Sequence, residues 1–140
     1  MLTALVALHT ILNTAYTLFC FILGFWALIV TVRNQPIPGG FWGALVTNEG
    51  LAIAILIMTL LLQAGGLPPA RGWLYYLYLL FFVIVLPGTF ALLRGRDDRT
   101  AAAIYTGIIL FTALTALTRS ELLTHYAAQM AQSSTAVPGP

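Results

Sequence analysis

Hydrophobic residues are grouped in four long runs along the chain, separated by short polar or turn-forming segments. The runs cover about residues 5–32, 42–63, 73–93 and 100–118. A helix needs roughly 20 mostly apolar residues to cross the hydrocarbon core of a bilayer, and each run is close to that length or exceeds it. The pattern therefore predicts four membrane-spanning segments.

The three connectors contain the residues that usually end helices. Residues 33–40 hold two prolines and two glycines, residues 65–72 hold two prolines and three glycines, and residues 94–99 are mostly charged. Backbone groups cannot stay unpaired in lipid, so long spans without a two-residue alternation must be helices rather than barrel strands. We predict an all-α integral membrane protein whose four transmembrane helices form an up-down-up-down bundle.

A single domain is expected to account for most of the chain. We assign it residues 1–132, because the helical pattern of the fourth span continues past residue 118 to about residue 132. Residues 133–140 contain two prolines and one glycine. We expect them to form a polar C-terminal tail outside the bilayer.

The composition narrows the class of protein. Of the 140 residues, 60% are hydrophobic and only 7% are charged, whereas soluble domains carry roughly a quarter charged residues. These values exclude a conventional soluble enzyme, a disordered chain and a nucleic-acid-binding surface, and the single cysteine excludes a disulfide scaffold. The expected partners are lipids and other membrane protein subunits, with no nucleic acid.

The distribution of arginine predicts the orientation. Four arginines flank the first and third connectors and two lie on the other side: Arg33, Arg94, Arg96 and Arg99 against Arg71 and Arg119. Because positive residues concentrate on the cytoplasmic side, we expect both termini on the outer face. All six basic residues are arginine, which suggests a GC-rich bacterial genome and hence a bacterial cytoplasmic membrane.

Small and polar residues recur at helical spacing on three spans and predict which faces meet. The first stripe is His9, Asn13, Tyr16, Cys20, Gly24 and Ala27; the second is Glu49, Ala52, Thr59 and Gln63; the last is Tyr105, Thr112, Thr115 and Arg119. Small pairs four residues apart are expected to allow close helix approach: Cys20–Gly24, Gly50–Ala54 and Ala103–Gly107. Asn48 is expected at the membrane interface.

The third span differs because aromatic residues crowd its first half. Trp and Tyr favour the membrane interface, which explains Trp73, Tyr75 and Tyr76. Contact with a neighbouring subunit, a pigment or a quinone is an alternative for the deeper rings. Pro87 is expected to free the carbonyl of Val83 and to bend the helix, which often opens a space.

Glu49 is the one acidic residue well inside a span, roughly 10 Å deep at the rise of an α-helix. An ionisable group at such depth is a candidate functional residue. Three roles stay open: pairing with an arginine that reaches inward (Arg33, Arg94 or Arg96), packing as a neutral acid, or relaying protons and binding a cationic substrate.

His9 and His125 are expected at nearly the same outer level, 24 residues before Arg33 and 26 residues after Arg99. Two facing imidazoles could hold haem b, with Arg119 available for a propionate. Both histidines also suit placement at the membrane surface, and we expect no haem b spectrum from the purified protein. A metal site is not expected, since no third ligand lies near either histidine in sequence.

No phosphate loop, paired cysteine motif or nucleophile with an adjacent base is present, so we expect no catalytic residues and no enzyme activity. The leading hypothesis is a non-catalytic accessory or structural subunit of a larger bacterial complex, most simply a photosynthetic or respiratory electron-transport assembly. One alternative is a small proton-coupled transporter that uses Glu49. The other is a redox subunit that binds haem or quinone at an outer polar group: His9, Asn13, Tyr16, Tyr76 and Arg119.

Overall fold

The computed structural model describes residues 1–66, 73–118, 131–132 and 135–136, and the regular structure in these ranges is helical. The four helices are α1 (Leu2–Val32), α2 (Gly39–Ala64), α3 (Trp73–Leu93) and α4 (Arg99–Thr118). Each is long and apolar enough to cross a membrane. The prediction of four long apolar helices is therefore confirmed, although α1 and α2 each begin three residues earlier than expected. The predicted continuation through residues 119–130 lies outside the described residues.

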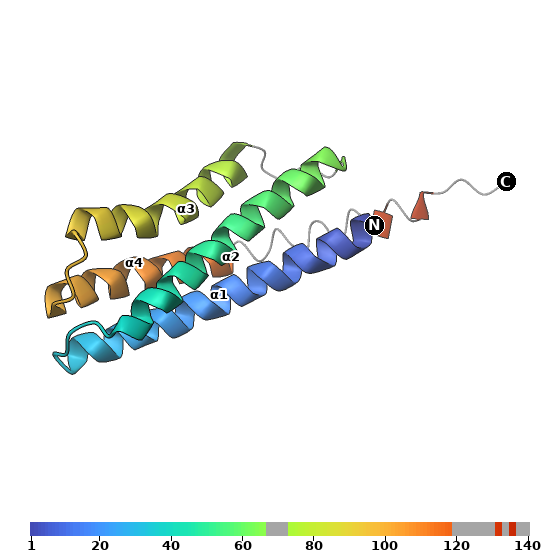
Figure 1. Ribbon diagram of the computed structural model, residues 1–140. Helices are drawn as coiled ribbons and strands as arrows, with labels where there is room; N and C mark the ends of the chain where they lie inside the picture. Colours follow the sequence, from blue (N-terminus) through green and yellow to red (C-terminus); the bar gives the residue numbers. More distant parts are fainter. Residues whose placement is uncertain (67–72, 119–130, 133–134, 137–140) are drawn as a thin grey trace.

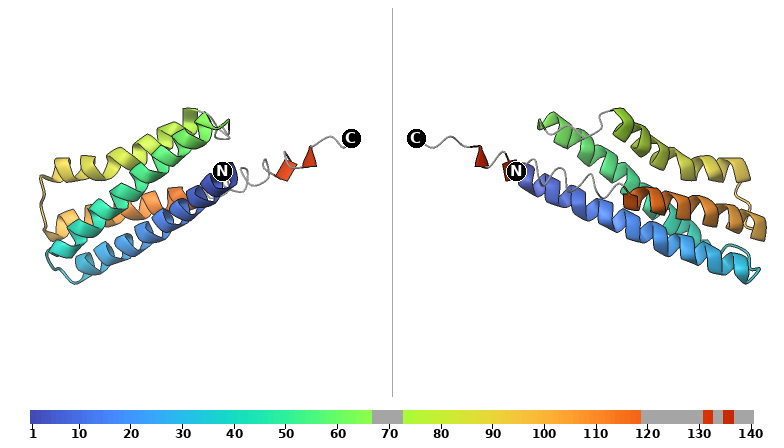
Figure 2. Two further views of the ribbon diagram at one scale, coloured as in Figure 1. Left: turned by 45° about the vertical axis from the view of Figure 1, so that its right-hand side comes forward. Right: turned by 180° about the vertical axis from the view of Figure 1, so that it is seen from behind.

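The helices lie side by side, and their packing is uneven (Figure 1). The closest packing joins α1 to α4, then α1 to α2, whereas α3 packs mainly on α2 and less on α4. Figure 2 shows from two other sides that α3 lies at the edge of the molecule, away from α1. As a result, α1 has the most extensive packing of the four helices and α3 the least.

Buried side chains recur at alternating steps of three and four residues along α1, α2 and α3. They include His9, Asn13, Tyr16, Cys20, Leu23, Ala27 and Val30 on α1; Phe41, Leu45, Asn48, Ala52, Ile55, Thr59 and Leu62 on α2; and Tyr75, Leu79, Phe82, Leu86, Thr89 and Leu93 on α3. A repeat of about 3.5 residues is typical of left-handed helix packing, in coiled coils and in membrane bundles. These three helices therefore each present one narrow stripe to their neighbours, whereas the buried face of α4 is wider and includes adjacent pairs such as Tyr105 and Thr106.

This repeat confirms the inward stripe predicted for α1 and corrects the one predicted for α2. Ala52 and Thr59 are buried as expected, but Glu49 is only half-buried and Gln63 is exposed. The buried residue at this level of α2 is Asn48, which was wrongly expected at the membrane interface. The physical reason is the register of the repeat: steps of four, three and four residues back from Thr59, through the buried Ile55 and Ala52, reach residue 48.

Gly24 allows the close approach of α1 and α4. A Cβ atom at this position would lie 2.5 Å from the Leu110 Cδ2 atom, well inside van der Waals contact. The glycines of the other two predicted small pairs behave differently, since a Cβ on Gly50 or Gly107 would meet no described atom within 4 Å. Close approach through those two pairs was therefore a wrong prediction for contacts within this chain.

The connector after α1 and the connector after α3 meet at one end of the molecule, on the left in Figure 1. The Ile37 amide donates a hydrogen bond to the Asp97 carbonyl at 2.8 Å. The helices that precede these connectors, α1 and α3, end in the same way. Each is followed by a residue with a left-handed backbone conformation, Asn34 (φ 53°) after α1 and Arg94 (φ 52°) after α3. In each case the next amide donates to a carbonyl five residues back, as in a Schellman motif.

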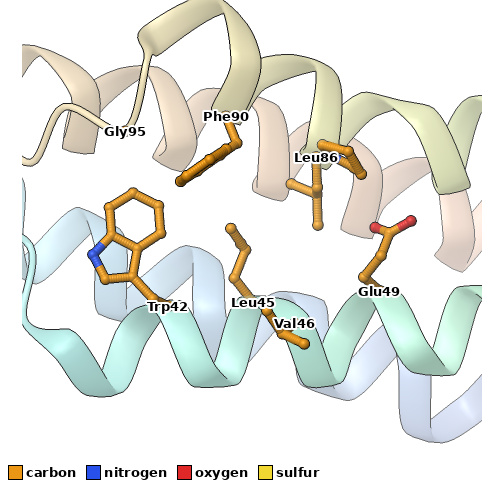
Figure 3. Close-up of a pocket in the computed structure, with 8 residues that line it drawn as sticks. Trp42, Leu45, Val46, Glu49, Leu86, Phe90 and Gly95 are labelled. Carbon is orange, nitrogen blue, oxygen red and sulfur yellow. The ribbon is translucent and has the colours of Figure 1, made fainter.

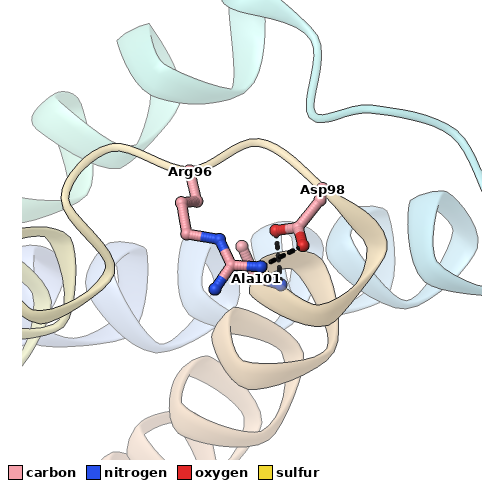
Figure 4. Close-up of polar contacts among 3 residues, drawn as sticks. All are labelled: Arg96, Asp98 and Ala101. Carbon is pink, nitrogen blue, oxygen red and sulfur yellow. Dashed lines mark hydrogen bonds and ion pairs between the residues drawn. The ribbon is translucent and has the colours of Figure 1, made fainter.

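Asp98 caps the beginning of α4 (Figure 4). Its Oδ1 atom accepts a hydrogen bond from the Ala101 amide at 3.3 Å, and its Oδ2 atom lies 2.5 Å from an Arg96 guanidinium nitrogen. Partial burial acts to raise the pKa of the Asp98 carboxyl, but the hydrogen bonds from Arg96 and Ala101 hold this pKa below its ordinary value. Asp98 is therefore ionised at neutral pH, which suits the N-terminus of a helix.

Gly24→Val is expected to weaken the packing of α1 on α4. The added atoms overlap Leu110, and overpacking of this kind costs about 1–3 kcal/mol of unfolding free energy. Unfolding of the purified chain in mixed detergent measures the effect. Gly107→Val is the matched control, because its surroundings are open, and an equal loss in both variants would contradict the role of Gly24.

Candidate functional site

Three polar side chains join three helices near the beginning of α1. The His9 Nε2 atom lies 3.1 Å from the Thr59 hydroxyl oxygen on α2 and 3.1 Å from the Tyr75 hydroxyl oxygen on α3. His9 is almost fully buried, with 1% of its surface exposed. This cluster therefore connects α1 to α2 and to α3 from inside the fold.

The hydrogen positions in this cluster are restricted by a further bond. The Thr59 hydroxyl donates to the Ile55 carbonyl at 2.8 Å, so its oxygen can only accept from His9. A ring nitrogen carries one proton at most, so Nε2 either donates to Thr59 or accepts from Tyr75. In either case a haem iron or metal ion at Nε2 would have to displace both contacts.

The other residues of the expected outer polar group lie apart from His9 or outside the described residues. Asn13 and Tyr16 are buried on the same face of α1, and the Tyr16 ring lies 5.5 Å from the Phe82 ring on α3. Tyr76 does not reach His9, because its hydroxyl donates to Gln63 at the surface. Its neighbour in sequence, Tyr75, contacts His9 instead. Arg119 and His125 lie outside the described residues.

A second polar cluster lies deeper, between α1 and α2. The Cys20 thiol donates to the Asn48 Oδ1 atom at 3.3 Å, and both side chains are fully buried. The Tyr16 hydroxyl lies close enough to Cys20, Asn48 and Glu49 to interact electrostatically with each. No hydrogen bond of ordinary geometry reaches the Tyr16 hydroxyl or the Asn48 amide nitrogen from the described residues. The expectation that Cys20 is a small buried residue is confirmed, although its thiol also bonds Asn48.

Glu49 follows Asn48 on α2 and lines a groove between α2 and α3 (Figure 3). The groove has a volume of about 620 Å³, and apart from Glu49 its lining side chains are apolar or aromatic. Figure 3 shows the Glu49 carboxylate directed toward α3, with Trp42 and Phe90 at the opposite end of the groove. An acid thus marks one end of the groove and aromatic rings mark the other.

The Glu49 carboxylate has no counterion among the described residues. Both of its oxygens are buried and accept no hydrogen bond there. Arg96 pairs with Asp98 instead, and neither Arg33 nor Arg94 forms an ion pair within the described part of the chain. An unpaired buried charge is costly, so at this position the carboxyl is stable only when it is neutral or when it meets a cation.

Pro87 lies inside α3 and lines the groove. Proline has no backbone N–H, so the bond to the Val83 carbonyl cannot form and the helix is free to bend. Leu86 and Phe90, on either side of Pro87, also line the groove. The expected opening beside Pro87 is present, since Pro87 is one of the residues that line the groove.

Sequence reasoning did not single out the aromatic end of the groove. The Trp42 ring lies 5.5 Å from the Phe90 ring and 5.7 Å from the Tyr105 ring, edge to face in both cases. Trp42 and Phe90 belong to different helices, and neither is part of a recognisable motif. The pattern did show Trp42 at the beginning of an apolar run, where a tryptophan is ordinarily assigned to the membrane interface.

Within the described residues, no three His, Cys, Asp or Glu side chains are grouped so that they could hold a metal ion. No protein-family model, curated protein or solved structure matches this chain. The function must therefore be argued from the chain's own geometry.

Tyr75→Phe is expected to lower the unfolding free energy by roughly 0.5–1.5 kcal/mol, since it removes one hydrogen bond between buried helices. Tyr105→Phe is the matched control. The Tyr105 hydroxyl is buried and has no hydrogen-bond partner among the described residues, so its removal should be neutral or stabilising. Unfolding in mixed detergent compares the two variants, and equal effects would rule out a stabilising role for the His9–Tyr75 contact.

Proposed function

We propose that the chain crosses a bacterial cytoplasmic membrane four times in up-down-up-down order, with both termini on the outer face. The bond between Ile37 and Asp97 supports this proposal, because it holds the first and third connectors at one end. These connectors carry four of the six arginines. Arginine-rich connectors stay in the cytoplasm.

Single cysteines introduced at opposite ends test this orientation. In a Cys20→Ser background, Ala136→Cys should react with a membrane-impermeant maleimide in intact cells, whereas Gln35→Cys should react only after permeabilisation. Both positions are exposed in the structure. The reverse pattern would invert the proposed topology, and equal labelling of both in intact cells would argue against any fixed orientation.

Within that membrane, we propose that the chain is a non-catalytic subunit that docks on a larger assembly through α3. The observation that carries this proposal is a hollow of about 500 Å³ along α3, whose lining among the described residues comes from this helix alone. Gly88 lies in the hollow, and a Cβ there would meet no described atom within 4 Å. Small residues in such a hollow suit the close approach of a second helix.

The same face favours a particular class of assembly. Phe81 lines the hollow, and the Tyr78 ring is also exposed on α3. Exposed aromatic rings inside a membrane suit contact with the flat ring of a pigment or a quinone. We therefore propose a photosynthetic or respiratory electron-transport complex as the class of partner.

Gly88→Leu tests the docking role. The added side chain should fill the hollow and reduce recovery of co-purifying membrane proteins by at least about tenfold, since tight helix contacts tolerate little extra volume. Gentle detergent purification followed by quantitative mass spectrometry measures the loss. Gly107→Leu is the matched control, because its site on α4 is also open. Retention of all partners by both variants would contradict docking through α3.

A proton-coupled carrier is the second candidate function, and the unpaired Glu49 carboxylate favours it. The geometry lends less support to a haem-binding role, because the His9 Nε2 atom already contacts Thr59 and Tyr75. A single carboxylate in a groove supplies a binding group but no complete path, so a carrier of this size would need several copies of the chain.

A further inference from the structure

We propose that the groove between α2 and α3 is a binding site for an elongated lipophilic cation. The positive group of this ligand pairs with Glu49, and its apolar body lies along the groove toward Trp42 and Phe90. The proposal does not depend on docking through α3, since the residues that line the groove differ from those of the α3 hollow.

The size and lining of the groove suit a small organic molecule. Its volume of about 620 Å³ falls in the usual range for ligand sites, roughly 300–1,000 Å³. Such sites are mostly apolar and contain one or a few polar groups that orient the ligand. Here Leu45, Val46 and Leu86 supply apolar walls, and Glu49 is the polar group.

The charge of the site selects a cation. Glu49 is the acidic group of the groove, and no described residue pairs with it or donates a hydrogen bond to it. A neutral ligand would leave the Glu49 carboxyl without a charged partner, whereas a cation would form an ion pair with it. The carboxylate oxygens are covered in the structure, so a rotation of the flexible Glu49 side chain accompanies binding.

The distance between the two ends of the groove sets the shape of the ligand. Glu49 and Trp42 are seven residues apart on α2, which corresponds to about 10 Å along the helix. Trp42 and Phe90 present edge-to-face rings at the far end. The ligand class is therefore an amine or quaternary ammonium whose aromatic or alkyl body extends about 10 Å from the charge.

Binding of a permanent cation requires an ionised Glu49, so a proton on the carboxyl must leave as the cation enters. The cation and the proton then compete for one carboxylate. Affinity should rise with pH, by up to about tenfold for each pH unit over which the carboxyl titrates. This coupling distinguishes a charge-paired ligand from one that is held by apolar contact alone.

The full-length chain in detergent provides the test, with trimethylammonium-diphenylhexatriene as the probe. This molecule has an aromatic rod and a permanent positive charge, and neutral diphenylhexatriene has the same rod without the charge. Equilibrium dialysis against protein-free micelles measures saturable binding of each probe. We expect the cationic probe to bind in about one copy per chain, more tightly at higher pH, and the neutral parent to bind at least about tenfold more weakly.

Three variants complete the experiment. Glu49→Gln should weaken binding of the cationic probe by at least about tenfold and remove its pH dependence. Val46→Phe should block the groove without changing any charge, since Val46 is exposed and lines it. Asp97→Asn, which removes the same charge in a connector, should bind as the wild type does. Melting temperatures show whether each variant is folded, and Val46→Phe keeps the test valid if Glu49→Gln is unstable.

Two results would overturn the proposal. Equal binding of the cationic probe by wild type, Glu49→Gln and Val46→Phe would place the probe outside the groove. Equal binding of the neutral parent, or of decylubiquinone, with no dependence on Glu49 would assign the groove to a neutral occupant such as a quinone or a lipid chain.

Discussion

The rest of the structure depends on the burial of polar side chains along α1. An unpaired polar group inside a helix bundle costs free energy, so each one restricts how the neighbouring helix can rotate. His9 meets Thr59 and Tyr75, and Cys20 meets Asn48, so α2 is oriented at two levels and α3 at one. One turn along α1 from Cys20, the absence of a side chain at residue 24 lets α4 approach closely.

This arrangement leaves α3 with the fewest constraints. Its contact with α4 is slight, and Pro87 interrupts its backbone hydrogen bonds. The bond between Ile37 and Asp97 ties its C-terminal connector to the opposite loop, while Tyr75 ties its beginning to His9. α3 is therefore tied near both ends, and the groove lies beside its C-terminal part, between α2 and α3.

Two kinds of interior polar group can be distinguished by their partners. His9, Thr59 and Cys20 have hydrogen bonds to other helices or to their own backbone, so they stabilise the fold. Glu49 has no such partner in the described part of the chain, although it is the most costly of these groups to bury. A fold that needed Glu49 only for packing would gain more from an apolar residue of similar volume, which is why the groove supports a binding role.

Within the described residues, the sequence by itself determined that there are four long apolar helices and where they begin and end to within three residues, because an apolar run is a local property of the chain that does not depend on the neighbouring helices. It also determined the inward face of α1, whose polar residues stand out from an apolar background. Only the tertiary structure decided that Asn48, not Glu49, faces α1, and that Tyr75, not Tyr76, meets His9. Adjacent residues differ by about 100° around a helix, so a small rotation set by packing against other helices exchanges their roles.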